Sequence, residues 1–356
     1  MDAPALDEGP QASVLLAWFD AHKRDLPWRR TTDPYAIWLS EIMLQQTRVD
    51  TVVPYFERFL VRFPDVRTLA GAPLEDVLSA WSGLGYYRRA RGLHAAAREI
   101  VSRYGGAVPR SFDELSTLPG VGAYTAGAVS SIAFGERAIA VDGNVTRVIT
   151  RLRGIDVGRS PGAVLREVRE ACEALVPSSR PGDFNQALME LGATVCTPAS
   201  PRCDVCPWRG GCAAAAAATR GEPRARPSKP NAARPARVKL IAALDWLEDG
   251  VLLGRRPLEG LFGGLWEPPM VEAPSAKARR RFRAAGIAIE GRPAKEAIVH
   301  VLTHRVLEVR SVRARSADVG ALEPYEQLRR FQAVDLPGLP MSALARRLLR
   351  VSFGVP

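Results

Sequence analysis

Residues 213–237 divide the chain into two parts with different patterning. Six alanines at 213–218 are followed by a Pro- and Arg-rich stretch, a composition typical of an extended linker. Before it, apolar residues recur at helical spacing, as between Pro34 and Phe63, and no convincing strand pattern occurs. After it, short apolar runs predict strands. At 356 residues the chain is long enough for two domains that each bury a core.

The N-terminal part is predicted to be mainly α. Pro54 interrupts the first apolar stretch and predicts the start of a new helix. Further helices fit the periodicity at 74–81, 89–104, 143–153, 161–175 and 181–195. The C-terminal part is predicted to be α+β, with strands at 239–246, 251–255, 297–302 and 306–312 and helices at 276–285 and 341–351. We therefore expect a mainly α domain at 1–212, a linker at 213–237 and an α+β domain at 238–356.

The net charge of +11 lies outside the predicted helical domain. Residues 1–212 carry 24 Lys and Arg against 24 Asp and Glu, whereas 213–240 carry 7 against 1 and 241–356 carry 18 against 13. A basic chain is typical of nucleic-acid binding. Phosphate contacts of the helical domain must therefore come from the placement of a few groups. The basic linker is equally compatible with a solvated tether and with DNA contact.

The sequence predicts a cytoplasmic protein. No run of 18 apolar residues is present, so no membrane span is expected. The first residues, with Asp2, Asp7 and Glu8, are acidic and polar, which is not typical of a signal peptide.

The segment 118–128 reads Leu-Pro-Gly-Val-Gly-Ala-Tyr-Thr-Ala-Gly-Ala. A helix at 111–117 is predicted to stop at the Leu-Pro pair, and a second helix is predicted to begin near Ala123. Between them, Gly120 and Gly122 can adopt positive φ and expose their amides at a helix N-terminus, where an anion is favoured. This pattern predicts a helix-hairpin-helix that binds one DNA phosphate without reading sequence. Taken alone, an ordinary glycine-containing turn explains it equally well.

Four cysteines follow the predicted helical core with the spacing C-x6-C-x2-C-x5-C; they are Cys196, Cys203, Cys206 and Cys212. Disulfides are not expected in a cytosolic protein. Four thiolates at this spacing can hold zinc or an iron–sulfur cluster. Zinc ribbons usually pair two C-x2-C knuckles, and the presence of only one favours [4Fe–4S]. Cys172 stands apart and is predicted to be a small core residue.

Two carboxylates occupy positions where chemistry is plausible. Glu41 lies between apolar residues of the stretch 38–44, so we expect it to be desolvated and its pKa to be raised, which suits a general acid. The alternative is a carboxylate on the polar stripe of an amphipathic helix. Asp142 precedes Gly143-Asn144 at a predicted helix start, where Asp is also a good N-cap.

The hairpin, Asp142 and the cysteine spacing together resemble the endonuclease III class of helix-hairpin-helix DNA glycosylases. Within that class, three segments resemble the MutY family of adenine glycosylases: Leu26-Pro-Trp-Arg29, residues 38–47 and Gly83-Leu-Gly-Tyr-Tyr87. The resemblance is dense over residues 14–212. A looser resemblance to that family's MutT-like domain rests on Gly263-Gly-Leu-Trp-Glu-Pro268 and His300-Val-Leu-Thr-His304.

The resemblance implies how the chemistry is divided among residues. Glu41 matches the general acid that protonates adenine at N7, and Asp142 the carboxylate that stabilises positive charge developing at C1′. Asn144 is expected to orient the water or Glu41. Tyr124 stands where bifunctional relatives carry a Schiff-base Lys, and a phenol cannot form that imine. We expect hydrolysis without strand cleavage, the alternative for Tyr124 being an exposed aromatic at a helix start.

The resemblance also implies DNA contacts. Gln46 and Tyr86 match residues that enter the base stack once adenine is flipped out of the duplex. Arg29 matches a residue that contacts the flipped adenine. Gly120 and Gly122 belong to the phosphate-binding hairpin.

The C-terminal domain implies recognition of 8-oxoguanine opposite adenine. The family's reader loop is usually Phe-Ser-His, and here it reads Leu302-Thr303-His304. Thr303 keeps a hydroxyl and Leu302 lacks the aromatic face; the alternative is a buried strand end with one surface histidine, His304. A Nudix hydrolase needs a carboxylate-rich helix, but residues 278–283 read Ala-Arg-Arg-Arg-Phe-Arg, so we expect no pyrophosphohydrolase activity.

Taken together, these features imply a monofunctional base excision repair glycosylase with one [4Fe–4S] cluster in the loop 196–212. Its implied partner is double-stranded DNA containing A:8-oxoguanine or A:G mispairs, and we expect a nucleoid-associated, bacterial-type monomer that does not bind membranes. One alternative is a bifunctional pyrimidine-damage glycosylase-lyase, against which Tyr124 argues. Another is a catalytically silent iron–sulfur protein that binds DNA or senses redox state, against which Glu41 and Asp142 argue.

Overall fold

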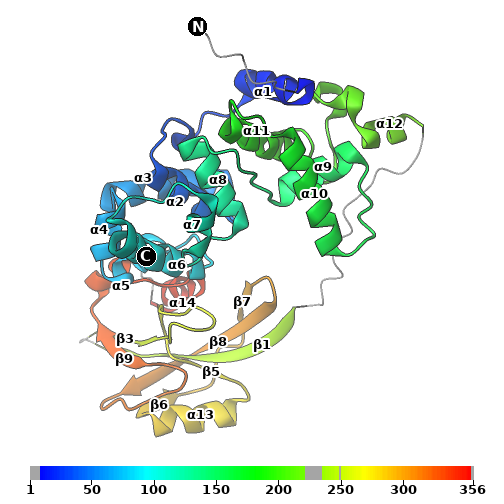
Figure 1. The fold of residues 1–356 in the computed structure, drawn as a ribbon. Helices are drawn as coiled ribbons and strands as arrows, with labels where there is room; N and C mark the ends of the chain where they lie inside the picture. The colour runs from blue at the N-terminus through cyan, green and yellow to red at the C-terminus, as the bar shows by residue number, and fades with distance from the viewer. Residues whose placement is uncertain (1–8, 221–234, 248–249, 354–356) are drawn as a thin grey trace. The chain divides into compact units, whose positions relative to one another are not determined.

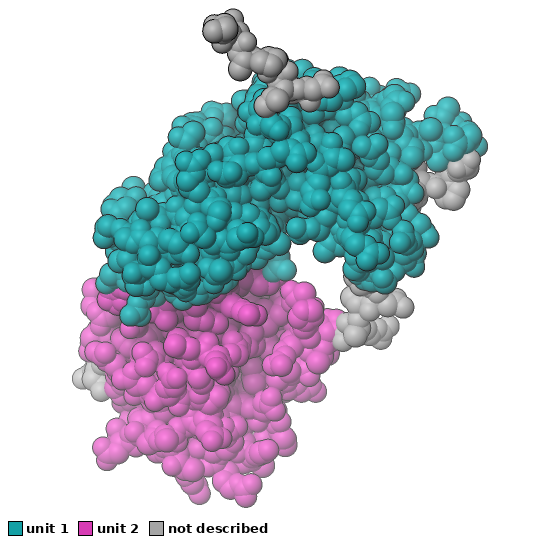
Figure 2. All heavy atoms as spheres, viewed as in Figure 1, with its two compact units in different colours: residues 1–71, 92–230 teal, residues 72–91, 231–356 magenta. Residues whose placement is uncertain are grey.

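The computed structural model describes residues 9–220, 235–247 and 250–353. The acidic start of the chain and residues 221–234 of the expected linker lie outside the described residues. The chain divides into two compact units, made of residues 1–71 with 92–230 and of residues 72–91 with 231–356 (Figure 2). Among the described helices, none combines the length and apolar character needed to cross a bilayer.

The first unit is helical, as predicted (Figure 1). Its α-helices are α1 (Pro10–His22), α2 (Pro34–Leu44), α3 (Val49–Arg62), α4 (Val66–Gly71), most of α6 (Arg88–Tyr104), α7 (Phe112–Thr117), α8 (Ala123–Phe134), α9 (Gly143–Arg153), α10 (Pro161–Leu175), α11 (Pro181–Thr194) and α12 (Ala213–Thr219). Short 3-10 turns are η1 (Pro27–Arg29), η2 (Cys203–Val205) and η3 (Arg209–Gly211). The predicted bounds of α9 and α10 match the structure, because both helices carry clear start and stop residues.

Side-chain caps explain where several of these helices begin. Asp33 accepts hydrogen bonds from two backbone amides of α2, and Ser160 accepts one from α10. Pro34 and Pro161 follow them at the first helical position, where a missing amide hydrogen costs nothing. The bounds of these two helices are therefore encoded locally.

The expectation that a new helix starts at Pro54 is wrong. Helix α3 begins at Val49 and continues through Pro54. The proline removes one intrahelical hydrogen bond. The helix persists because it buries an apolar face formed by Val52, Phe56 and Phe59.

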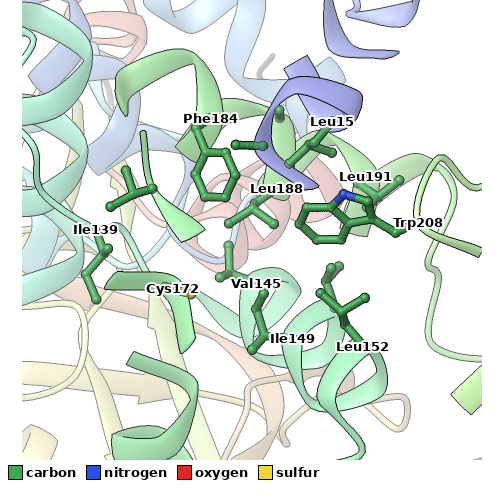
Figure 3. Close-up of a cluster of buried hydrophobic side chains, with 14 of the residues drawn as sticks. Leu15, Ile139, Val145, Ile149, Leu152, Cys172, Phe184, Leu188, Leu191 and Trp208 are labelled. Atoms are coloured by element: carbon green, nitrogen blue, oxygen red, sulfur yellow. The ribbon is translucent and has the colours of Figure 1, made fainter. Parts of the chain in front are cut away.

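One hydrophobic core of the first unit is formed by α1, α9, α10 and α11 (Figure 3). Leu15, Ile149 and Leu188 are among its fully buried members. Cys172 is 1% exposed within it, which confirms its prediction as a small core residue. Trp208, from the segment between the third and fourth cysteines of the run, packs into the same core.

The second unit is α+β, as predicted. Its strands are β1 (Ala236–Leu244), β2 (Trp246–Leu247), β3 (Gly250–Arg255), β4 (Trp266–Glu267), β5 (Met270–Glu272), β6 (Ile287–Glu290), β7 (Ile298–Val301), β8 (Arg305–Ser316) and β9 (Gln327–Phe331). Its helical elements are α5 (Leu74–Ala80), α13 (Ser275–Ala284), the 3-10 turn η4 (Ala333–Gly338) and α14 (Ala343–Phe353).

These strands form two sheets (Figure 1). One has the order β5-β1-β8-β6, with β7 also paired to β8. Only the β1–β8 pair in it is parallel, with Ile241 opposite Arg310. The other sheet joins β2, β3, β4 and β9 in antiparallel pairs. Helix α13 covers one face of the first sheet through Ala278 and Phe282, and α14 covers the other.

Residues 72–91 group with the C-terminal unit rather than with the helices around them in sequence. The indole nitrogen Nε1 of Trp266 donates to Glu75 Oε1 at 2.6 Å. The hydroxyls of Ser79 and Tyr87 donate to the carbonyl oxygens of Gly338 and Met341 at 2.6 and 3.0 Å. These contacts join residues more than 190 positions apart, so no local pattern could have predicted them.

The start of the expected linker is helical. Residues 213–219 form α12, whereas the sequence suggested an extended segment. Alanine is the best helix former, and its propensity decides where no proline intervenes. The extended character expected for the rest of the linker falls mostly on residues 221–234, which lie outside the described residues.

Candidate functional site

A buried carboxylic acid stands at the centre of the first unit. Helix α2 is buried on all its faces from Tyr35 to Met43, so Glu41 on this helix is only 5% exposed. The hydroxyl of Tyr124, from the first turn of α8, donates to Glu41 Oε2 at 2.6 Å. It also lies 3.4 Å from the sulfur of Met189 on α11. Packing of α2 against α8 and α11 against α8 brings these three side chains together.

Burial raises the pKa of Glu41 to about 7. The hydrogen bond from Tyr124 and the charge of Arg29 lower this pKa, while the negative charge of Asp142 raises it. The expectation of a desolvated carboxyl with a raised pKa therefore agrees with the structure. A carboxyl group in this range holds a proton that it can donate at neutral pH.

Asp142 acts as the N-cap of α9, and both of its carboxylate oxygens are held. Its Oδ1 accepts from the amide of Val145 at 2.7 Å, and its Oδ2 accepts from Asn144 Nδ2 at 2.9 Å. The capping and the functional interpretations are thus compatible, because the cap fixes the carboxylate. A fixed negative charge near Glu41 can stabilise a developing cation without reorganising.

Asn144 contacts Asp142, and no hydrogen bond from it to Glu41 is present among the described residues. Its Oδ1 accepts from Arg147 Nη2 at 2.8 Å, and Arg147 Nε donates to the carbonyl of Cys196 at 2.8 Å. In the structure Asn144 holds Asp142, and its expected role in orienting the water or Glu41 stays a prediction. A hydrogen-bonded chain runs from that carboxylate to the first cysteine of the cysteine run.

Arg29 is held by a buried carboxylate that the sequence reasoning missed. Glu190 on α11 is 1% exposed, and its oxygens accept from Arg29 Nη2 at 2.9 Å and from Arg24 Nε at 2.7 Å. Burial raises the pKa of Glu190, but the hydrogen bond from Arg24 and the charge of Arg29 outweigh it and hold that pKa below its usual value. Glu190 follows Leu188-Met189 and precedes Leu191. The flanking apolar residues are the same signal that identified Glu41.

The hairpin between α7 and α8 has one left-handed glycine rather than two. Gly120 has φ of 76°, and its Cα packs against Gly92 of α6, where an added Cβ would lie 3.2 Å from the Gly92 Cα. Gly122 is the N-cap of α8 and has φ of −96°, so the expectation of positive φ at this position is wrong. An N-cap residue normally adopts extended backbone. No side chain caps α8, and no atom of the described residues lies within 4 Å of a Cβ built at Gly122.

Gln46 and Tyr86 share an unusual backbone conformation. Among the described residues, only Gln46, Tyr86 and Phe262 combine a side chain with positive φ; the values are 59°, 48° and 56°. Such strained residues concentrate at functional sites because the surrounding structure must impose them. Gln46 and Tyr86 are both exposed, the latter by 47%. The two residues expected to enter the DNA base stack thus also share a positive φ, which is rare for residues with a side chain.

Thr303 and His304 lie at the tip of the hairpin between β7 and β8. The amide of Leu302 donates to the carbonyl of Arg305 at 2.8 Å, closing the turn, and both Thr303 and His304 are exposed. The hydroxyls of Thr303 and Tyr86 are 3.0 Å apart. These two candidate DNA contacts therefore lie together in the second unit.

The four cysteines Cys196, Cys203, Cys206 and Cys212 line one pocket at the end of the first unit. Arg151 lies beside them: its Nη1 is 3.4 Å from Cys196 Sγ, and its carbonyl is 3.5 Å from Cys212 Sγ. No group of three or more His, Cys, Asp or Glu within the described ranges is arranged to hold a single metal ion. The four cysteines thus line one shared space.

Two family models match the chain. Residues 39–174 match the HhH-GPD superfamily of base excision DNA repair proteins, and residues 242–351 match the NUDIX domain. The first match contains the hairpin, Glu41 and Asp142. Among solved structures, a thermostable thymine-DNA glycosylase is similar with a TM-score of 0.53 and 33% identity, over 58% of this chain and 95% of that one.

Curated relatives carry the description adenine DNA glycosylase. The protein of Mycolicibacterium smegmatis is 45% identical over 201 residues, which cover 55% of this chain and 68% of that protein. The mouse protein is 41% identical over 308 residues, or 73% of this chain, and the chain spans 60% of the mouse protein's length. With the buried acid, the capped aspartate and the hairpin in one helical unit, the chain belongs to the family of adenine DNA glycosylases.

Proposed function

We propose that the protein hydrolyses the N-glycosidic bond of adenine mispaired with 8-oxoguanine or guanine in duplex DNA. The observation that carries this proposal is the buried Glu41, whose pKa of about 7 makes it a usable acid beside the fixed carboxylate of Asp142. Adenine is a poor leaving group unless it is protonated, and a general acid supplies that proton. Family membership supports the same assignment.

In this proposal Glu41 gives its proton to adenine N7 as the bond to C1′ breaks. The deoxyribose becomes cation-like, and Asp142 stabilises it electrostatically. Asp142 is suited to this role because both of its oxygens are already held, so it is aligned before the charge develops. Water then adds to C1′ and gives one proton to the carboxylate of Glu41, which restores the acid and leaves an abasic site and free adenine.

Tyr124 supports a monofunctional reaction. A lyase needs an amine that forms an imine with C1′, and the phenol of Tyr124 cannot form one. Its hydroxyl is instead engaged with Glu41. We propose that Tyr124 sets the position and pKa of the acid and leaves the DNA strand intact.

Access of Glu41 to adenine requires the base to leave the duplex. The amides at the start of α8, next to the open space at Gly122, would bind a backbone phosphate. Gln46 and Tyr86 would fill the stack that the base leaves. Arg29, held by Glu190, would contact the flipped adenine.

Thr303 and His304 are proposed to read the base opposite adenine. Their position on an exposed hairpin tip supports contact with DNA, and the hydroxyl of Thr303 offers a hydrogen bond to a base edge. The absence of acidic residues in α13 supports the proposal that this domain reads rather than hydrolyses. The protein would act as a monomer on double-stranded DNA, associated with the nucleoid.

The cysteine pocket fits a [4Fe–4S] cluster better than zinc. Zinc ribbons usually pair two C-x2-C knuckles, whereas this run of cysteines contains only one. A cubane binds each thiolate through a different iron, which suits thiols spread around a pocket. Cys196, Cys203, Cys206 and Cys212 would hold the cluster, which fastens the loop that carries them, and Arg151 would offset its negative charge.

Single-turnover cleavage of a duplex with one A:8-oxoguanine pair tests the proposed reaction. Adenine release by the wild type, and its loss by about 1000-fold or more in Glu41→Gln, is expected for a general acid. Asp20→Asn provides a matched control, because Asp20 is an exposed carboxylate paired with Arg180 and lies outside the site. Release that survives Glu41→Gln would overturn the mechanism.

The alternatives give different outcomes in the same experiment. A silent DNA-binding or redox protein would bind the duplex without releasing adenine. A pyrimidine-damage glycosylase-lyase would prefer damaged pyrimidines and would be trapped covalently by borohydride, whereas our proposal expects no efficient trapping. An absorption band near 400 nm, or stoichiometric zinc in its absence, identifies the bound metal.

A further inference from the structure

The second unit contains a concave basic pocket that the proposed glycosylase reaction does not use. Its volume is about 570 Å³. It is lined by Lys239, Leu240 and Ile241 of β1, Ala273, Arg279 of α13, Arg292, Pro293, and Glu308 and Arg310 of β8. All of these residues belong to one unit.

The pocket forms where the sheet extends beyond α13. In the parallel β1–β8 pair, Lys239 lies opposite Glu308 and Ile241 opposite Arg310. Alternate residues of a strand share one face, so these four side chains lie on the face that α13 covers further along. Ile241 is already under that helix, in contact with the cluster that contains Phe282. On the same face Lys239 and Arg310 are exposed, and Glu308 is half-buried.

The charges of the pocket are not balanced. Four cations line it against the single carboxylate of Glu308, which already pairs with Arg237. Arg279 donates to the carbonyl of Gly291. Lys239, Arg292 and Arg310 have no ion-pair partner in the part of the chain that the structure describes. Like charges held around a concave surface repel one another unless an anion enters.

The pocket lies beside α13, where basic residues replace the carboxylates of a NUDIX hydrolase. Hydrolases with the matched NUDIX domain need carboxylates on this helix to bind Mg²⁺, and residues 275–284 include none. Arg279 projects from the same helix into the pocket. Guanidinium and ammonium groups can bind phosphate oxygens directly, without a metal ion.

We propose that this pocket binds the phosphates of a nucleoside di- or triphosphate in the absence of divalent metal. Lys239, Arg279, Arg292 and Arg310 contact the phosphate oxygens. Pro293, which lines the same pocket, supplies apolar surface for the remainder of the ligand. The volume lies within the 300–1,000 Å³ typical of small-molecule sites.

A compact ligand fits this site better than a DNA backbone. Duplex phosphates on one strand follow the helix axis at about 3.4 Å per residue and present a convex surface. The four cations here surround a hollow, which suits phosphates joined directly to one another. The proposal is independent of the glycosylase activity, so either can fail without the other.

Isothermal titration of the full chain with pyrophosphate and with dATP, both in EDTA, tests the proposal. Both ligands are expected to bind the wild type with micromolar affinity. The double variant Arg292→Gln, Arg310→Gln should bind about 100-fold more weakly, since each charge-assisted contact is worth roughly a factor of ten. Adenine release from duplex DNA should be unchanged in this variant.

The matched control is Arg313→Gln, Arg315→Gln, on the same strand but outside the pocket. Both residues are exposed, and the ion pair of Arg315 with Glu290 is exposed too, so the fold should tolerate the change. This control loses the same net charge and should retain full affinity. Equal weakening in both variants, or no binding by the wild type, would refute a specific pocket. If duplex DNA binds in a way that depends on Arg292 and Arg310 while dATP does not bind, these cations contact the DNA backbone. That outcome would also refute the nucleotide pocket.

Discussion

At the scale of single residues, Glu41 shows how burial produces a catalyst. Its neighbours on α2 exclude water, and the carboxyl group therefore holds its proton to about pH 7. The sequence allowed this to be predicted, because the residues around Glu41 in the stretch 38–44 are apolar except for Ser40. It did not reveal that Asn144 holds Asp142, or that Glu190 holds Arg29, since those partners depend on side-chain rotamers and on the packing of α11.

The rate of adenine release should depend on the protonation of Glu41. Above pH 7 the protonated fraction falls about tenfold for each pH unit, and the single-turnover rate should fall with it. Rates measured between pH 5.5 and 9 on an A:8-oxoguanine duplex check this. A rate that stays constant up to pH 9 would show that Glu41 is not the acid.

Tyr124→Phe should move this alkaline limb to higher pH. The hydrogen bond from Tyr124 stabilises the charged carboxylate and lowers its pKa, so its loss raises the pKa of Glu41. The shift should be up to about one pH unit, given the usual worth of a hydrogen bond. A merely structural role for Tyr124 would lower the rate at every pH without moving the limb.

Glu41 should also make the stability of the first unit depend on pH. Its pKa is raised from 4.5 in the unfolded chain to about 7 in the folded protein. The stability that it contributes is therefore fully present below pH 4.5 and is lost as pH rises to 7. The loss amounts to about 3 kcal/mol in the free energy of unfolding.

Glu41→Gln removes this titration. The free energy of unfolding of the variant, relative to that of the wild type, should therefore rise by about 3 kcal/mol between pH 4.5 and 8. Urea unfolding at both pH values, with Asp20→Asn as control, measures the difference. A pH-independent gap between wild type and Glu41→Gln would contradict the raised pKa.

At the scale of elements, local start and stop residues determined which boundaries could be predicted. Helices α9 and α10 begin at capping side chains and were placed correctly. Pro54 was misjudged because tertiary packing of α3 outweighs one lost hydrogen bond. Strands β4, β5, β6 and β9 were missed; with two, three, four and five residues, they are short and show little periodicity.

The two glycines of the hairpin should separate folding from DNA binding. Gly120→Ala places a Cβ on a residue with φ of 76° and 3.2 Å from the Gly92 Cα, which should destabilise the fold by about 1–3 kcal/mol. Gly122→Ala meets open space at ordinary φ, so it should cost about 1 kcal/mol or less. Its main effect should be on the affinity for duplex DNA.

Thermal unfolding and fluorescence anisotropy on a nonspecific duplex distinguish these effects. Gly122→Ala should weaken binding severalfold with nearly unchanged melting temperature, because a methyl group obstructs the approach of a phosphate. Gly135→Ala, at the C-cap of α8, is a control with similar strain to Gly120→Ala but away from the hairpin. Unchanged DNA affinity in Gly122→Ala would remove the hairpin from the proposed interface.

At the scale of the whole molecule, the chain passes between its two units three times, at residues 71–72, 91–92 and 230–231. The sequence predicted a helical part and an α+β part, and both are present. It could not predict that 72–91 belongs to the latter, because the contacts of Glu75, Ser79 and Tyr87 reach partners far along the chain.

Cleavage of the linker should therefore not release the C-terminal domain. A protease site inserted within residues 221–234 would give two fragments, but the second remains attached to residues 72–91 through buried contacts such as Tyr87 to Met341. The fragments should co-elute in size-exclusion chromatography under native conditions and separate in denaturant. Separation without denaturant would show that these contacts are too weak to hold the unit together.

The shared membership of Tyr86 and Thr303 in one unit bears on how lesion search and excision are connected. Both candidate mispair contacts belong to the second unit, where their hydroxyls are 3.0 Å apart, whereas Glu41 and Asp142 belong to the first. The chain itself links the two units at 71–72 and 91–92, and the second of these junctions lies inside helix α6. Lengthening the linker would then leave the dwell time on a lesion unchanged. A glycine inserted at 91–92, inside α6, would uncouple that dwell time from base removal, so that the protein pauses at the right sites and fails to release adenine.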